Sequence, residues 1–207
     1  MTASAFLGQP LEKMKTLDYG MGWAGWARIA VGLGCESYGT DLAQPRMDYA
    51  ARHGVHTVTD AQITDYRFHF INTEQVFEHV TRPLDLARRL ASALEPGGIL
   101  KVSVPEGRTA EAIVAKLQSG AYRGDRDSII PVQPLEHVNC FRRASIAAMA
   151  ASVGLAIVKP GPWHGYAFLR RRGTISLARP KKAIKELVRP WYQWRNPTNL
   201  YVWLRKP

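Results

Sequence analysis

Cysteines and long apolar runs are scarce in this chain of 207 residues. Its two cysteines, Cys35 and Cys140, form no C-x-x-C pair, which argues against a redox motif or a cysteine-based zinc site. The longest uncharged apolar-rich run, residues 145–158, is too short to cross a bilayer and contains Gly154. The N-terminus shows no continuous apolar segment of the signal-peptide type. We therefore expect a globular protein of the reducing cytoplasm.

Acidic residues are almost missing from the last quarter of the chain. Residues 159–207 contain 12 Lys and Arg but only one acid, Glu186, whereas residues 1–158 contain 16 residues of each sign. The whole net charge of +11 therefore comes from this last quarter. A basic block of this kind attracts anionic partners, and the attraction weakens as salt is added.

Glycine, in contrast, is concentrated in one turn at residues 17–25. Gly20, Gly22 and Gly25 let the backbone N–H groups of this turn approach a ligand closely. Asp41 follows at a distance of roughly 20 residues, where an acidic side chain can bind the hydroxyls of a ribose. The pattern predicts a site for a nucleoside cofactor.

The three glycines also satisfy the G-x-G-x-x-G pattern of dinucleotide-binding folds, which is a weak signal alone. Asp18 decides between the two interpretations, because a carboxylate two positions before the first glycine would repel a pyrophosphate. The same carboxylate suits a cationic amino-acid ligand. The chain also has no second domain to carry a substrate, so a nicotinamide oxidoreductase is disfavoured.

Four stretches in order resemble the class I S-adenosylmethionine (SAM) methyltransferases. They are the Asp-x-Gly-x-Gly turn from Asp18, the acidic Asp41, residues 70–80 with their Glu-His-Val segment, and Leu94–Pro105 with its Pro-Gly-Gly turn. The resemblance covers about residues 16–158, and it places the chain in the Glu-His-Val subgroup. It implies that the protein is an SAM-dependent methyltransferase.

The resemblance also implies which residues bind SAM. Asp18, Gly20, Gly22, Asp41 and Glu74 are expected to converge on the cofactor at the strand ends. The segment that touches adenine in relatives is short in this chain. By position, its best candidates are Thr59, Asp60 and Ala61.

Two histidines are candidates for a general base. By resemblance, His79 and His137 lie near the acceptor, and imidazole can accept a proton at neutral pH. Each also has a purely structural interpretation: His79 as a loop residue that caps the following helix, and His137 as a hydrogen-bonded lid residue. The six histidines show no metal-ligand spacing with the cysteines, so the sequence predicts no metal site.

Strand-like and helix-like patterns alternate along the chain, which predicts a doubly wound α/β fold. Strands are expected near residues 16–19, 35–41, 55–58, 68–72, 98–104 and 155–159. Helices are expected at residues 24–33, 45–53, 83–94 and 142–153. Residues 198–206 resemble the antiparallel last strand of the methyltransferase family. These patterns and the resemblance together imply one domain, residues 1–207, with a seven-stranded, mostly parallel, Rossmann-like sheet.

A basic and aromatic insertion is expected at about residues 160–197, before the last strand. Within it, Ile184, Leu187, Val188 and Trp191 have the spacing of one apolar helix face, with lysines and arginines on the other faces. Such a helix can lie on an anionic membrane, through residues 170–195, or it can pack on its own domain. The sequence does not decide between these two arrangements, so a peripheral location at the membrane stays open.

Two functions from different classes follow. The first is SAM-dependent methylation of a hydroxyl, or as a second choice an amine, on a small-molecule or glycan-type acceptor, including one carried by an anionic lipid. The second is a catalytically inactive methyltransferase-like module whose basic C-terminal region docks an anionic membrane or nucleic acid. Nucleic acid is the weaker partner, because the basic residues gather in one insertion and form no recognition motif.

Overall fold

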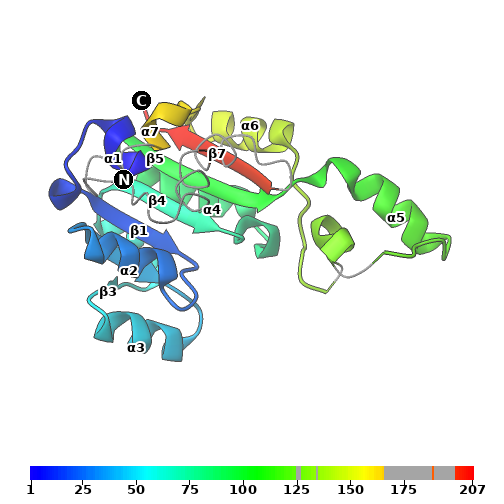
Figure 1. The fold of residues 1–207 in the computed structure, drawn as a ribbon, viewed down its shortest axis with the longest axis horizontal. Helices are drawn as coiled ribbons and strands as arrows, with labels where there is room; N and C mark the ends of the chain where they lie inside the picture. The colour runs from blue at the N-terminus through cyan, green and yellow to red at the C-terminus, as the bar shows by residue number, and fades with distance from the viewer. Residues whose placement is uncertain (125–126, 134, 166–187, 189–198) are drawn as a thin grey trace, which may run out of the picture.

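A seven-stranded sheet runs through the centre of the protein (Figure 1), with the order β3-β2-β1-β4-β5-β7-β6. This computed structural model describes residues 1–124, 127–133, 135–165, 188 and 199–207. The strands are β1 (Lys15–Tyr19), β2 (Glu36–Thr40), β3 (His56–Thr57), β4 (Phe68–Glu74), β5 (Leu94–Pro105), β6 (Ala156–Val158) and β7 (Asn199–Arg205).

The strand directions confirm the predicted doubly wound sheet. Strands β3, β2, β1, β4 and β5 pair in parallel, and β7 lies antiparallel between β5 and β6. All seven strands lie within a few residues of their predicted positions. Strand β5 is the exception in length, because it starts at Leu94 and so includes the Pro-Gly-Gly turn.

Helices connect the strands. They are α1 (Thr2–Leu7), α2 (Gly25–Gly32), α3 (Gln44–Arg52), α4 (Pro83–Ser92), α5 (Ala110–Gln118), α6 (Arg143–Ser152) and α7 (Pro162–Gly165). Of these, α2, α3 and α4 fill crossovers between parallel strands. The four predicted helices correspond to α2, α3, α4 and α6. Short 3-10 helices are η1 (Leu11–Lys13), η2 (Asp60–Asp65), η3 (Phe77–His79), η4 (Gly107–Thr109) and η5 (Asp127–Val132).

Helix α5 was not predicted, and it differs from the others in its environment. It extends away from the sheet (Figure 1), and none of its residues is buried. A helix that buries no apolar stripe leaves little periodic signal in the sequence. Helices α1 and α7 were missed because they are only 6 and 4 residues long.

The main core lies on the face of the sheet that packs against α4 and α6. Leu17, Ile71 and Leu100 are opposite one another in the strand register and are 0% exposed. They form one cluster with Leu90 and Ile146 from the two helices. A fully buried side chain of this size contributes about 1.5–3 kcal/mol, so this layer fixes the strand ends firmly in place.

The other face of the sheet changes from apolar to polar along the strands. At the amino end, Phe70 stacks with Trp26 at 5.7 Å and meets Trp203 edge-on at 5.2 Å. Two residues further along β4, on the same face, is Asn72, which the register places opposite Asp18 and Lys101. The polar residues therefore gather toward the carboxyl ends of the strands.

A small apolar cavity of about 100 Å³ lies at the amino end of the sheet, lined by residues such as Met14, Thr16 and Trp26. It is separated from the polar strand ends by the aromatic layer around Phe70. The basic insertion falls almost entirely outside the described residues, and so does the predicted amphipathic helix around Ile184. Among the helices that are described, none is long and apolar enough to cross a bilayer.

Candidate functional site

The glycine turn leaves β1 and is tied to the neighbouring strand β2. Backbone N–H groups of Gly20 and Met21 both donate to the carbonyl oxygen of Thr40 at 3.0 Å. Gly20 and Gly22 have positive φ values of 69° and 54°, which favour glycine. Among described residues, no atom lies within 4 Å of the position of an added Cβ at Gly22 or Gly25. The turn therefore presents bare backbone, as close approach of a ligand requires.

Gly20 must lack a side chain for a different reason. A Cβ at this position would lie 2.6 Å from Cγ2 of Val76, the residue that precedes η3. Gly20 thus lets the turn after β1 pack directly against the segment that follows β4. Ala24, the residue before α2, adopts a left-handed φ of 55° and is fully buried. That conformation costs a non-glycine residue about 1–2 kcal/mol.

Asp41 follows β2 and joins the glycine turn to α3. Its Oδ2 accepts from the backbone N–H of Gly22 at 2.9 Å, and its Oδ1 accepts from the backbone N–H of Ala43 at 3.0 Å. Arg46 forms an ion pair with Oδ1 at 3.2 Å, and the Asp41 side chain is 7% exposed. The structure confirms that Asp41 lies beside the glycine turn, and it shows that Arg46 already uses this carboxylate.

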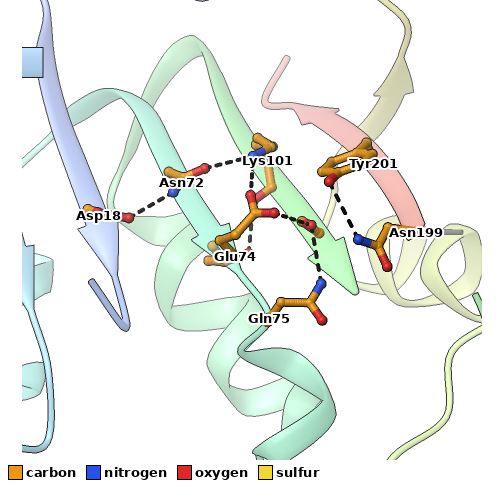
Figure 2. Close-up of polar contacts among 9 residues, drawn as sticks. Asp18, Asn72, Glu74, Gln75, Lys101, Asn199 and Tyr201 are labelled. Atoms are coloured by element: carbon orange, nitrogen blue, oxygen red, sulfur yellow. Dashed lines mark hydrogen bonds and ion pairs between the residues drawn. The ribbon is translucent and has the colours of Figure 1, made fainter. Parts of the chain in front are cut away.

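Asp18 begins a chain of polar contacts across three strands (Figure 2). Nδ2 of Asn72 donates to Oδ1 of Asp18 at 2.7 Å, and Nζ of Lys101 donates to Oδ1 of Asn72 at 3.0 Å. Burial raises the pKa of Asp18 to about 6, although the hydrogen bond from Asn72 acts in the opposite direction. A cationic ligand beside Asp18 would favour its ionised form.

Glu74 lies at the end of the same chain, on the last residue of β4. Its carboxylate accepts from Nζ of Lys101 at 2.5 Å and from Oγ of Ser103 at 2.8 Å (Figure 2). Lys101 also lies over the ring of Tyr201, with Nζ 5.4 Å from the centroid. Sequence reasoning missed Lys101, yet a signal was present: it is the only charged residue in the apolar stretch from Gly98 to Val104.

The predicted adenine segment follows β3, and protein partners occupy much of it. Asp60 accepts a hydrogen bond from the Tyr19 hydroxyl at 2.9 Å and forms an ion pair with Arg89 of α4. Thr59 starts η2, where its side chain and that of Gln62 form a capping box. Ala61 is exposed. Tyr19, the last residue of β1, is therefore the link between this segment and the glycine turn.

The structure brings His79 and His137 together, although they are far apart in the sequence. Their ring centroids are 4.9 Å apart. Nδ1 of His79 lies 2.7 Å from the carbonyl oxygen of Glu136. A carbonyl can only accept, so Nδ1 carries the proton and Nε2 of the neutral ring keeps its lone pair. His79 is exposed, so this nitrogen is available to a ligand.

Backbone hydrogen bonds hold the two Glu-His-Val segments, residues 78–80 and 136–138, against each other. The carbonyl oxygen of Glu78 accepts from the backbone N–H groups of Val138 at 2.8 Å and Asn139 at 3.1 Å. The Asn139 side chain donates to the carbonyl oxygens of Val80 at 2.6 Å and Phe77 at 3.2 Å. The second segment is thus clamped over the first.

Glu78 lies beneath the two histidines and was not singled out as a site residue from the sequence. It is 1% exposed, and within the described part of the chain neither carboxylate oxygen has a hydrogen-bond partner. Burial raises the pKa of this carboxyl. Glu78, His79 and His137 each offer one ligand atom, and these atoms lie within 4.8 Å of one another. The sequence predicted no metal site, because this group forms only in the folded chain.

The two halves of the site meet at the carboxyl end of β4. Gln75 has a positive φ of 54° and turns the chain out of the strand toward η3. Val76 then contacts Gly20, and the backbone N–H of His79 donates to the Val76 carbonyl oxygen at 3.0 Å. A cofactor on the glycine turn and an acceptor at His79 would therefore be neighbours. The bare turn, with carboxylates at two adjacent strand ends, fits a nucleoside that carries a cationic amino acid.

Comparisons with known proteins agree with this geometry. The family described as "Methyltransferase domain" matches residues 3–159. No curated protein matches the chain at a significant level. Among solved structures, the magnesium protoporphyrin IX methyltransferase of Synechocystis PCC 6803, with bound S-adenosylhomocysteine (SAH), is 14% identical at a TM-score of 0.60, and the match covers 100% of this chain and 80% of that one.

Two further structures show the same fold. An SAM-dependent methyltransferase of Archaeoglobus fulgidus is 12% identical at a TM-score of 0.60, covering 95% of this chain and 88% of that one. Another, of Mesorhizobium loti, is 16% identical at a TM-score of 0.53, covering 100% and 98%. These identities show the fold alone, whereas the family match extends over most of the chain. The chain belongs to the methyltransferase domain family and is an SAM-dependent methyltransferase, as the resemblance predicted.

Proposed function

We propose that the protein binds SAM on the glycine turn and methylates a hydroxyl group held at His79 and His137. The observation that carries the proposal is the contact between the two halves of the site. The bare backbone of the turn touches, through Val76, the segment that presents the free Nε2 of His79. Donor and acceptor would thus be held at neighbouring strand ends.

Each half has a distinct task in this proposal. SAM supplies an electrophilic methyl group on a positively charged sulfur. Asp18 attracts the ammonium group of its methionine part, Asp41 binds the ribose, and the backbone at Gly20 and Gly22 lies along it. Positioning of two reactants in this way can be worth roughly 7–11 kcal/mol. The segment Thr59–Ala61 is the proposed adenine contact.

The sequence suggested that Glu74 contacts the cofactor directly, whereas we propose an indirect role for it. Its carboxylate is bonded to Lys101 and Ser103. An unpaired Lys101 would repel a sulfonium cation, so we assign to Glu74 the neutralisation of this charge. The acceptor proton is the task of the histidines: a hydroxyl needs a group that accepts its proton, and this adds about 10²- to 10⁴-fold in rate. An amine is the second choice of acceptor, and a small molecule or glycan is the proposed class.

Calorimetric titration with SAH tests the donor half. Asp41→Asn should weaken binding at least tenfold, because the ribose loses its charged partner. Asp48→Asn, on the exposed side of α3, is the matched control and should bind as the wild type does. Incubation of methyl-labelled SAM with a panel of phenols and sugars then tests the acceptor class. The absence of SAH binding by the wild-type protein at millimolar ligand would overturn the proposal.

One observation favours the second candidate, an inactive binding module. Arg46 already pairs with the carboxylate that a ribose would need. In that case SAH binding fails, while the basic C-terminal region, residues 170–195, docks anionic vesicles or, as the weaker alternative, nucleic acid. Docking of this kind should fall steeply as salt is added. Vesicle binding with and without anionic lipid, measured beside SAH titration, separates the two functions.

A further inference from the structure

We propose that Glu78, His79 and His137 bind a divalent transition-metal ion, and that this ion holds the acceptor oxygen beside the methyl donor. The second part rests on the proposed function. The first part stands on the side chains alone. Both depend on three residues that only the folded chain brings together.

The carboxylate of Glu78 is the central observation. It is 1% exposed, and among the described residues no other residue donates to either of its oxygens; only its own backbone N–H lies close to it. A buried carboxylate without a partner costs several kcal/mol, so proteins almost always pair it with a cation or with hydrogen-bond donors. The described residues around it provide two imidazoles and no lysine or arginine in contact, which favours a metal cation over an ion pair.

His79 shows the arrangement expected of a metal ligand. Its Nδ1–H donates to the backbone carbonyl of Glu136, which fixes both the tautomer and the orientation of the ring. Histidines that bind metals commonly donate their second N–H to a carbonyl or carboxylate in this way. The remaining Nε2 has its lone pair available for coordination.

His137 is brought to the same place by the backbone. The N–H groups of Val138 and Asn139 donate to the Glu78 carbonyl, so the residue after His137 is anchored directly to the residue that supplies the carboxylate. The three ligand atoms lie within 4.8 Å of one another. Bonds of about 2.0–2.2 Å to one ion would draw them closer by a modest contraction.

Two nitrogens and one carboxylate favour a borderline ion such as Zn²⁺ or Co²⁺ over Mg²⁺, which prefers oxygen ligands. Three protein ligands also leave a coordination position open. An acceptor hydroxyl in that position would ionise more readily, as metal-bound water does, and would release its proton to solvent water before the oxygen takes the methyl group from the sulfonium. In this case the histidines would act on the hydroxyl through the metal ion and would not accept its proton themselves, because one nitrogen lone pair cannot bind an ion and a proton at once.

The test uses Co²⁺ added to the tag-free full-length protein, followed by visible absorption and equilibrium dialysis. The wild type should bind one equivalent and show visible d–d absorption of the kind expected for mixed nitrogen and oxygen ligands. Glu78→Gln, His79→Gln and His137→Gln should each weaken binding about 10- to 100-fold. His53→Gln and Glu111→Gln, both exposed and remote from the cluster, are the matched controls and should bind normally.

SAH titration of the same samples shows whether each variant is folded and whether the donor half works. Normal SAH binding without Co²⁺ binding in the wild type, or equal Co²⁺ binding by the wild type and all three variants, overturns the metal site. Site-specific Co²⁺ binding without SAH binding supports the metal site and defeats the proposed function. If Glu78→Gln does not fold, His79→Gln decides the result, because His79 is exposed and its loss leaves the core intact.

Discussion

The donor half and the acceptor half of the site are built in opposite ways. The donor half consists of strand ends and one short turn, and the carboxylates of Asp18 and Asp41 each have protein partners. The acceptor half joins η3 to a segment far along the chain and leaves the buried carboxylate of Glu78 without a partner among the described residues. The comparison shows that the glycine turn and Asp41 are brought together by a short local motif, whereas the group around Glu78 depends on tertiary contacts.

The largest expected effect is a loss of kcat in His79→Gln, a single substitution that affects the acceptor half and not the donor half. His79→Gln keeps a donor for the Glu136 carbonyl but removes the Nε2 lone pair, so kcat for a hydroxyl acceptor should fall about 10²- to 10⁴-fold. The Kd for SAH should stay within about twofold of the wild-type value, because the donor half is untouched. Steady-state rates and SAH titration check both. Equal losses in kcat and in SAH affinity would mean that the two halves are one unit.

The next effect concerns the donor half and its pH dependence. The folded pKa of Asp18, about 6, lies above its ordinary value of 3.8, so the folded protein binds the proton more tightly than the unfolded chain does. Stability should therefore fall as the pH rises from about 4 to 6 and stay level above, by about 3 kcal/mol at most. Asp18→Asn should remove this loss. Urea unfolding at pH 4, 5, 6 and 7 gives the difference, and parallel curves for the two proteins contradict the assignment.

A smaller loss is expected from the clamp between the two Glu-His-Val segments. Asn139→Ala removes the hydrogen bonds to the carbonyl oxygens of Phe77 and Val80 and leaves both carbonyls without that donor. The free energy of unfolding should fall by about 1–3 kcal/mol, and KM for the acceptor should rise. SAH affinity should not change. Ser152→Ala, which removes a single helix-end hydrogen bond on α6, provides the comparison.

The smallest effect tests whether Arg46 competes with the ribose for Asp41. Arg46→Gln should tighten SAH binding by about two- to fivefold, since exposed ion pairs of this type are worth about 0.2–1 kcal/mol. Arg52→Gln, on the same helix and exposed, should leave the Kd unchanged. Weaker binding by Arg46→Gln would show instead that Arg46 orients the carboxylate for the ligand.

The sequence was sufficient for the sheet and for the position of Asp41 beside the glycine turn, because both follow local rules. Apolar alternation located β1 and β4, and the spacing from Gly20 to Asp41 placed both at adjacent strand ends. Helix α5 gave no signal because it buries nothing. Glu78 could not be identified as exceptional, because its burial and its approach to His137 depend on contacts between segments that are distant in the sequence. Whether the predicted SAM-binding residues, the two histidines and the basic insertion bind ligands stays a prediction.

Val76 occupies the space that a side chain at Gly20 would need, and it lies three residues before His79. A displacement of the glycine turn would therefore move Val76, and through the short backbone stretch that follows it would also move His79. A donor seated on the glycine turn would therefore set the position of η3 before an acceptor reaches His79.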